Sequence, residues 1–307
     1  MLRYFPLLLI VGILTQISCK KNDSKVQNIQ KTVLVGLGRV PNNSRYAVFK
    51  YDFEQDKTIQ ISEPLITSTG AWAIDRQKGI YYIVNYVGNN PPQLIGVNLS
   101  DGMVIVKDNL SKPFNCQCVI DGKLYGSVTD SASNTEIVTY DFQKKNFSKI
   151  LSISGSYSII FDELNNRVLA KYYPNCQENY YIFDLKTGQM LDSIDNLSNI
   201  SIMEASGEDN KYYGLDNFSS KNSDFISYSF DNNTITKICD YGTNNIFDGG
   251  STVDLNNHAY YYYMFGSSKT INLVKINTNN GTKMTYPNIE MLGFIKVFSY
   301  VEPSGSK

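Results

Sequence analysis

Histidine is almost absent from the chain, since its 307 residues include only His258. Zinc sites need several His or Cys ligands at short spacing, and the sequence has no His pair, no Cys/His cluster and no HExxH motif. His258 follows the turn-forming segment "DLNN", so we expect a turn or surface residue there rather than a general base. These absences argue against zinc hydrolases and favour a protein without catalytic activity.

Charged residues are also scarce: they make up 19% of the chain, the net charge is -1, and no basic run occurs. Nucleic-acid-binding proteins carry basic patches, so nucleic acid is not an expected partner. Long apolar runs are missing apart from Tyr4–Leu14 in "MLRYFPLLLIVGILTQISC". This run has the length of a secretory signal core, about 7–15 residues, and falls short of the ~20 residues of a bilayer-spanning helix. We therefore expect residues 1–18 to be a signal peptide.

Cys19 stands where such a signal would be cut. The segment "QISCKKND" resembles the lipobox of bacterial lipoproteins, with Ile17 and Ser18 before the Cys and Gln16 where Leu is usual. The other interpretation is an ordinary cleaved signal in which Cys19 has no role. The "CKKND" start is similar to that of lipoproteins from Bacteroidetes-type bacteria. The resemblance implies a lipid on Cys19, a flexible tether over residues 19–30, and an outer membrane lipoprotein facing the periplasm or the cell surface.

A hairpin-like segment recurs along the rest of the chain. Tyr, which favours strands, is abundant at 23 residues, and segments such as "YDFEQDKTIQI" and "YIFDLKTGQML" each combine a strand, a tight turn and a new strand. The aligned turn residues, 46, 43, 43, 47 and 46 positions apart, are Asp52, Asn98, Asp141, Asp184, Asp231 and Asn277. A mean period of 45 residues with four short strands is the signature of a β-propeller blade. A pair of sandwiches would not repeat so evenly.

Each period divides into four strands, which in the fourth period are "YSIIFD", "RVLAKYY", "YYIFDL" and "QMLDSI". The first period supplies only three strands, and one apolar strand, Glu290–Tyr300, is left over at the chain end. We expect that strand to be the innermost strand of blade one, because ring closure removes open sheet edges. The prediction is an all-β, six-bladed β-propeller of four-stranded antiparallel blades over residues 31–300, followed by a disordered tail over residues 301–307.

The strand pattern and the "D-x-x-T-G"-like turns of Lys31–Tyr300 resemble those of six-bladed propellers of the TolB-like or YVTN-like type. The resemblance implies a ring architecture and no particular chemistry, because these motifs specify the fold. In such rings, ligands generally bind on the face that carries the loops between second and third strands and the entries to the first strands. The candidate ligand-binding residues on that face are Arg39, Trp72, Asn85, Tyr86, Tyr173, Asp216 and Asn217.

Aromatic side chains mixed with amides and charges suit a glycan, a peptide or an envelope protein. The favoured function is therefore a membrane-anchored, non-catalytic binding module. It is expected to be monomeric, without a cofactor, and attached to the membrane only through its lipid. The other interpretation of the candidate residues is that Trp72 packs between blades, and that Arg39 and Asp216 are solvated loop charges.

The alternative function is a calcium-dependent hydrolase or lactonase of the gluconolactonase type. Such an enzyme needs a calcium site of carboxylates and amides in the axial tunnel. Glu204, Asn217 and Asp248 are of the right types, but no motif connects them.

The remaining cysteines are expected to have structural roles. An exported protein can form disulfides, and Cys116 and Cys176 fall on the same face of neighbouring blades, which makes them a candidate bridge. Cys118 and Cys239 lie within predicted strands and are expected to pack as small hydrophobic residues.

Overall fold

A computed structural model describes residues 30–155, 157–172, 179–194, 200–205, 210–216, 223–242, 246–254, 256–265, 271–287, 289 and 291–301. The chain divides into two units, one of which is Thr32–Tyr300. Of the other unit, Met1–Lys31 with Val301–Lys307, only Gln30, Lys31 and Val301 are described, as terminal residues of strands. No helix able to cross a bilayer occurs among the described residues.

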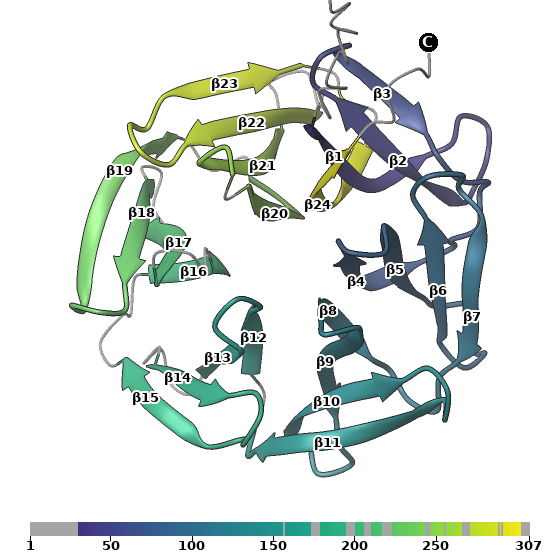
Figure 1. Cartoon of the computed structure of the whole chain (residues 1–307), viewed down its shortest axis with the longest axis horizontal. Helices are drawn as coiled ribbons and strands as arrows, with labels where there is room; N and C mark the ends of the chain where they lie inside the picture. Colours follow the sequence, from purple (N-terminus) through teal and green to yellow (C-terminus); the bar gives the residue numbers. More distant parts are fainter. Residues whose placement is uncertain are drawn as a thin grey trace, which may run out of the picture. The chain divides into compact units, whose positions relative to one another are not determined.

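The unit Thr32–Tyr300 is a ring of six antiparallel four-stranded sheets, the blades, with one strand of each blade next to the axis (Figure 1). From the innermost strand outward, blades one to three are β24 (Met291–Val301), β1 (Gln30–Arg39), β2 (Tyr46–Asp52), β3 (Lys57–Gln60); β4 (Thr69–Asp75), β5 (Ile80–Asn85), β6 (Gln93–Asn98), β7 (Val104–Asn109); and β8 (Asn115–Ile120), β9 (Lys123–Thr129), β10 (Thr135–Asp141), β11 (Asn146–Ile153). Blades four to six are β12 (Tyr157–Asp162), β13 (Arg167–Tyr172), β14 (Asn179–Asp184), β15 (Met190–Ile194); β16 (Ile200–Ala205), β17 (Lys211–Asp216), β18 (Ser223–Ser229), β19 (Thr234–Gly242); and β20 (Ile246–Asp254), β21 (Ala259–Phe265), β22 (Ile271–Asn277), β23 (Lys283–Tyr286). The predicted six-bladed propeller is confirmed.

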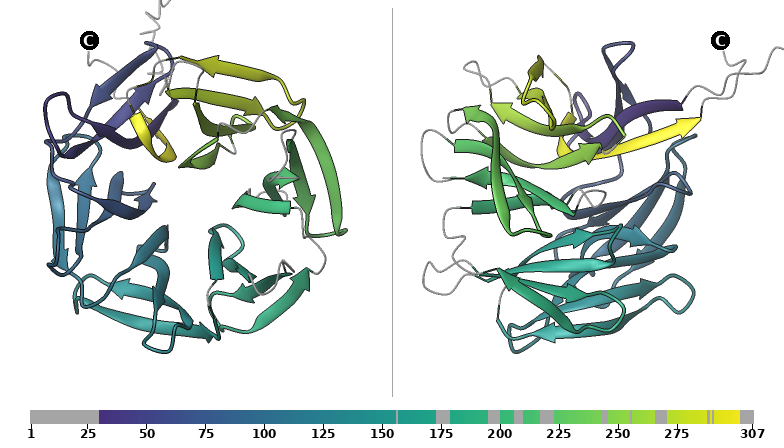
Figure 2. Two further views of the ribbon diagram at one scale, coloured as in Figure 1. Left: turned by 180° about the vertical axis from the view of Figure 1, so that it is seen from behind. Right: turned by 60° about the vertical axis from the view of Figure 1, so that its left-hand side comes forward.

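The C-terminal strand closes the ring as predicted. β24 lies beside β1 although the two strands stand at opposite ends of the sequence (Figure 2). The side chains of Ile295 and Val297 are buried in the core between blades one and six, and the hydroxyls of Thr32 and Ser299 lie 3.0 Å apart. Blade one therefore depends on both ends of the propeller sequence.

The hairpin turns between third and fourth strands explain the repeat. In blade four, Oδ1 of Asp184 accepts hydrogen bonds from the backbone N–H groups of Lys186 at 2.9 Å and Thr187 at 2.7 Å. Such bonds from an Asp or Asn side chain to its own turn fix the bend locally. The residues that end the third strands of the six blades are Asp52, Asn98, Asp141, Asp184, Ser229 and Asn277.

Blade five corrects one position of the predicted repeat. Its aligned residue, Asp231, lies within the turn, two positions beyond the end of the third strand at Ser229. The left-handed turn residue is Asn233, with a φ of 56°. The turn follows Ser229, which is neither Asp nor Asn, so an alignment on acidic or amide residues selects the next Asp along the chain. The predicted spacing of the repeat is therefore correct to within two residues, but the predicted turn residue of blade five is wrong.

Three glycines mark a second regularity, because they occur in the same turn of blades two, four and six. Gly102, Gly188 and Gly281 have φ values of 74°, 70° and 72°. A Cβ atom at Gly102 would lie 1.9 Å from the carbonyl oxygen of Ile61, at the outer edge of the preceding blade. A Cβ at Gly281 would lie 2.5 Å from the corresponding oxygen of Ile238. Glycine is required there both by the left-handed backbone and by the close approach of two blades.

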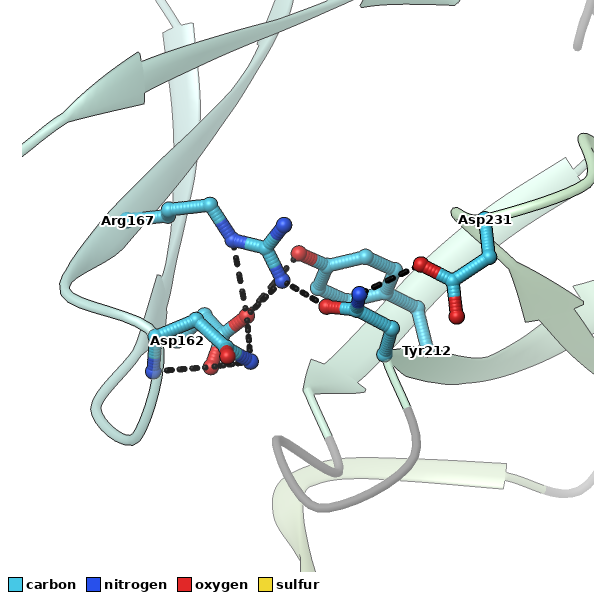
Figure 3. A network of polar contacts seen from close by, with 6 residues as sticks. Asp162, Arg167, Tyr212 and Asp231 are labelled. Atoms are coloured by element: carbon cyan, nitrogen blue, oxygen red, sulfur yellow. Dashed lines mark hydrogen bonds and ion pairs between the residues drawn. The ribbon is translucent and has the colours of Figure 1, made fainter.

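A buried polar network connects blades four and five (Figure 3). Arg167 is 9% exposed at its side chain and Asp162 is 1% exposed, and Nη2 of Arg167 lies 2.7 Å from Oδ2 of Asp162. The hydroxyl of Tyr212, on the neighbouring blade, donates to the same Oδ2 atom at 3.0 Å. Nη2 of Arg167 also donates to Oδ1 of Asn210 at 2.6 Å, and Nδ2 of Asn210 donates to Asp231 at 2.5 Å. These contacts fix the two blades to each other through paired rather than isolated charges.

Candidate functional site

The predicted binding face is defined by the ends of the second strands. Arg39, Asn85 and Asp216 are the last residues of β1, β5 and β17, each of which is the second strand of its blade. Equivalent strands run in equivalent directions around the ring, so these residues share one face. Arg39 is exposed and Asp216 is partly exposed, whereas Tyr173 and Asn217 lie outside the described residues. We call the face at the carboxyl ends of the second strands the entry face.

Asn85 holds a loop of the entry face and is not itself available to a ligand. It is 2% exposed, and its Oδ1 atom accepts hydrogen bonds from the N–H of Thr67 at 2.9 Å, the hydroxyl of Thr67 at 3.1 Å and the N–H of Ser68 at 3.3 Å. The amide oxygen is therefore fully used within the protein. Sequence reasoning placed Asn85 on the correct strand end but gave it the role of a contact rather than of a loop anchor.

Tyr86 follows Asn85 and is half-buried. Its ring packs against the core between blades two and three, and burial raises the pKa of its phenol. Its backbone N–H donates to the carbonyl oxygen of Ser68 at 2.8 Å, and its own carbonyl accepts from the hydroxyl of Thr67 at 2.9 Å. Hydrogen bonds therefore hold the backbone on both sides of Tyr86, and the accessible part of its ring projects from this fixed backbone.

Trp72 packs between blades, which was the alternative interpretation of this residue. It lies in β4, is partly buried, and packs against the core between blades one and two, as do Phe298 and Tyr300 of the closing strand. This placement makes Trp72 a contact between blades.

A second group of polar side chains meets near the axis, and we call it the axial cluster. It consists of Glu204 on β16, Ser251 on β20, Tyr260 on β21 and Lys296 on β24. The hydroxyl of Ser251 donates to Oε1 of Glu204 at 3.1 Å and is also hydrogen-bonded to the hydroxyl of Tyr260. Nζ of Lys296 lies 4.0 Å from Oε2 of Glu204, with exposed fractions of 14% and 20% for the two side chains. Blades one, five and six thus contribute to one site.

Two β-bulges orient side chains of the axial cluster. The pairing of β16 with β17 shifts between Ile202 and Glu204, and that of β20 with β21 shifts between Ile246 and Ser251. A bulge adds unpaired residues to one strand and redirects the side chains that follow, and bulges are frequent next to functional sites. Glu204 and Ser251 are in each case the first paired residues after the irregularity.

Burial raises the pKa of the Glu204 carboxyl, while the Lys296 ammonium and the Ser251 hydroxyl act in the opposite direction. The burial effect is the largest of the three, so the carboxyl is held above its ordinary range despite its cationic neighbour. A carboxyl with a raised pKa keeps its proton to a higher pH than a surface glutamate does. Perturbed groups of this kind are concentrated at functional sites.

A second ion pair lies toward the same end of the ring as Glu204. Nη1 of Arg76, in the turn after β4, is 2.5 Å from Oε2 of Glu163, in the turn after β12. These turns belong to blades two and four, so the pair spans blade three. Glu204 is the penultimate residue of its innermost strand, and the innermost strands run toward these turns. We call this end of the ring the turn face; it is opposite the entry face.

Sequence reasoning named Glu204 but missed its partners. Arg76 and Glu163 stand in the turns "RQK" and "ELNN", where charged residues are ordinary and carry no signal. Lys296 offered the one available signal, because it interrupts the apolar strand "GFIKVFSY". A charge within an otherwise apolar strand needs a polar partner in the folded protein.

His258 is the left-handed residue of the turn between β20 and β21, with a φ of 46°, and it is exposed. The prediction of a turn residue there is confirmed.

The cysteines of the described residues are free thiols. Cys116 and Cys118 are buried in β8, where burial raises the pKa of both thiols, and Cys239 is partly buried in β19. Cys176 lies outside the described residues. Cys116 is a free thiol in this structure, so the predicted disulfide gains no support from it. Cys118 packs as a small hydrophobic residue, as expected.

The residues named for a calcium site are distributed as follows. Asn217 lies outside the described residues, and of Asp248 only the backbone is described. Among the described residues, Glu204 pairs with the ammonium of Lys296 at 4.0 Å. Among the residues that the structure describes, no three His, Cys, Asp or Glu side chains are grouped in a way that would hold a metal ion.

Comparisons with known proteins give structural relatives only. No protein-family model and no curated protein sequence matches the chain. TolB from Acinetobacter baumannii superposes with a TM-score of 0.63 at 13% identity, over 88% of this chain and 66% of that one, which is just under two thirds of its length. A protein from Agrobacterium tumefaciens described as TolB gives 0.61 at 9% identity, over 89% of this chain and 98% of that one. A protein from Bacteroides fragilis described as a 6-phosphogluconolactonase gives 0.56 at 9% identity, over 90% and 99%. This chain shares the propeller fold with all three.

Proposed function

We propose that the protein is a membrane-anchored envelope lipoprotein whose propeller binds a glycan, peptide or protein partner without catalysis. The observation that carries the proposal is the construction of the entry face. Arg39, Tyr86 and Asp216 come from three different blades, and the loop beside Tyr86 is fixed by the hydrogen bonds of Asn85. Side chains held by a rigid rim lose little conformational freedom on binding, which favours affinity.

The proposed lipid anchor and envelope location rest on the N-terminal segment. An apolar run followed by Ser18-Cys19 is similar to the signal of an exported lipoprotein. Cys19→Ala should therefore move the protein from the membrane fraction to the soluble fraction of the envelope and abolish labelling with a radioactive fatty acid. Cys239→Ala, which removes a thiol within the propeller, is the matched control and should leave both readouts unchanged. Membrane association and acyl labelling that survive Cys19→Ala would contradict the anchor.

The test of the entry face is capture of a partner from envelope extract by the immobilised mature chain. Arg39→Ala combined with Tyr86→Ala should abolish capture, because it removes the exposed cation and the aromatic surface of two neighbouring blades. The matched control, Lys186→Ala with Asn279→Ala, removes exposed side chains from turns on the turn face and should leave capture intact. Circular dichroism and thermal unfolding of both variants establish that the fold is preserved. Capture lost in the control and kept in the Arg39/Tyr86 variant would refute the proposed face.

A second candidate function is the calcium-dependent hydrolase or lactonase, which the likeness to a protein described as a 6-phosphogluconolactonase favours. The electrostatics of the axial cluster weigh against it. The ammonium of Lys296, 4.0 Å from Glu204, already balances the carboxylate that a calcium ion would need, and a divalent cation next to it would be repelled. We therefore keep the binding module as the proposed function.

A further inference from the structure

Large apolar side chains are exposed at the turn-face ends of the outermost strands. Most of those that are exposed among the described residues come from blades two, four and six: Met103, Val104 and Ile105, then Met190 and Leu191, then Met284. Each lies within one residue of the start of β7, β15 or β23. Outermost strands follow the turns between third and fourth strands and therefore begin at the turn face. We call these six side chains the apolar rim.

One position of the apolar rim recurs in all three blades. The third residue after the turn glycine is Ile105 in blade two, Leu191 in blade four and Met284 in blade six, and their exposed fractions are 49%, 52% and 56%. Equivalent positions of equivalent hairpins lie at the same height on the ring. β7, β15 and β23 are far apart on its outer edge (Figure 1). Single exposed apolar residues are ordinary, but three at one height on alternate blades fit a flat and extended partner.

Two β-bulges argue against a partner that pairs as a strand. The pairing of β6 with β7 skips Ile105, and that of β14 with β15 skips Leu191, so each of these residues is the extra residue of a bulge in an outermost strand. A bulge interrupts the hydrogen-bonding edge and is one of the devices that keep edge strands from pairing with another chain. The apolar rim therefore offers side chains rather than a strand edge.

The connection to the proposed lipid anchor is made at the turn face. Val33 of β1 pairs with Asp52, the last residue of the third strand of blade one, so Thr32 lies at the turn-face end of β1. Cys19 is thirteen positions before Thr32, and a chain of that length spans at most about 45 Å. Tethering over a short linker gives an effective concentration of about 1 mM, so contacts too weak to hold a free protein become populated.

The charges of the turn face do not supply the attraction. Two well-exposed lysines of its turns are paired with carboxylates of the protein, Lys78 with Asp75 and Lys145 with Asp108. The chain as a whole has a net charge of -1. A contact made by the apolar rim should depend little on salt, unlike the adsorption of a basic surface to anionic lipids.

We propose that the turn face rests on the bilayer that holds the lipid anchor, with the apolar rim at the boundary between headgroups and acyl chains. The inference rests on the proposed anchor and adds a second contact to it, whereas the sequence led us to expect attachment through the lipid alone. Each of the three blades contributes a methionine, Met103, Met190 or Met284, whose flexible side chain adapts to an irregular surface. The entry face is then directed away from the membrane, toward its partner.

The test uses the lipidated mature chain in phosphatidylcholine vesicles, with an environment-sensitive fluorophore on one introduced thiol and with Cys176→Ala and Cys239→Ala to remove competing thiols. With the fluorophore on Met190→Cys, brominated lipids should quench at least about half of the emission, because tethering keeps the contact populated. The matched control carries the fluorophore on Ser131→Cys, an exposed position of the entry face, and should keep its emission. About 1 M salt should leave the quenching unchanged.

A variant of the apolar rim tests whether these side chains make the contact. Ile105→Ser with Leu191→Ser and Met284→Ser, the rim variant, should lose most of the quenching at Met190→Cys. It should still float with the vesicles and unfold at the same temperature, because the three side chains are about half exposed and contribute little to the core.

Three outcomes would overturn the inference. The first is a chain that floats with the vesicles but whose fluorophore on Met190→Cys is quenched no more than that on Ser131→Cys, which refutes the docking and leaves the anchor intact. The second is quenching that the folded rim variant leaves unchanged or that salt abolishes. The third is a Cys19→Ala chain that forms dimers in solution and loses them in the rim variant, which would make a second copy the occupant. A chain that neither floats nor carries an acyl label refutes the anchor, and the docking with it.

Discussion

A chain that stops at Pro287 should fail to give a soluble folded monomer. It lacks β24, the innermost strand of blade one, so β1 presents an open edge to the axis. Ile295 and Val297 are 0% and 5% exposed, and full burial of such a side chain contributes about 1.5–3 kcal/mol. Together with Phe298 and Tyr300, which pack against blade two, their loss approaches the whole net stability of a domain, about 5–15 kcal/mol.

The measurement is the soluble yield and the rate of limited proteolysis, compared between chains that end at Pro287 and at Val301. The chain that ends at Val301 is the control and should behave like the full-length protein, since it keeps all of β24. A point variant, Ile295→Asp, should reproduce most of the defect by placing a charge in the core between blades one and six. Unchanged thermal unfolding of the chain that ends at Pro287 would show that β24 does not close the ring.

Arg167→Met should lower the free energy of unfolding by about 3–5 kcal/mol, because it leaves the Asp162 carboxylate buried without its cation. The loss extends beyond the pair, since Nη2 of Arg167 also donates to Asn210, and its guanidinium lies 4.8 Å from the ring centre of Phe230 on blade five. The variant therefore weakens the contact between two blades as well as the turn within one. Urea unfolding followed by circular dichroism gives the difference.

The matched control is Arg76→Met, which breaks an arginine–carboxylate pair of 2.5 Å at a more exposed place. The side chains of Arg76 and Glu163 are 42% and 26% exposed, and solvent-exposed pairs contribute only about 0–1 kcal/mol. Equal stability changes in the two variants would contradict the prediction, because burial of the Asp162 network would then add nothing to the loss of an ion pair.

The repeat and the strands were readable from the sequence because they are decided locally. Turns of the Asp184 kind are fixed by bonds between a side chain and its own backbone two and three residues later, so their position is visible in a short window. Between such turns, strand limits follow almost directly, as in blade four, where the predicted first strand and β12 coincide at Tyr157–Asp162. Closure was predictable by elimination, because blade one lacked a strand and the chain end offered one.

Local reasoning failed where a turn departs from the common pattern. In blade five the third strand ends at Ser229, and the acidic residue that the repeat requires appears two positions later as Asp231. The side chain of Asp231 accepts a bond from Asn210, at the start of another hairpin, instead of from its own turn. The contact joins two turns of the same blade that are 21 residues apart, so a short window of the sequence does not reveal it.

The axial cluster and the loop contacts were decided only by the tertiary structure. Lys296 is 92 positions from Glu204, and Arg76 is 87 positions from Glu163, so neither pair leaves a spacing that a sequence motif would reveal. The role of Asn85 was likewise hidden, because its three donors come from a loop 17 and 18 residues earlier. The sequence by itself determined the period, the turns and the number of blades, since those depend on neighbouring residues. Ring closure alone decided which charged side chains face one another, because it brings innermost strands from distant blades to a common axis.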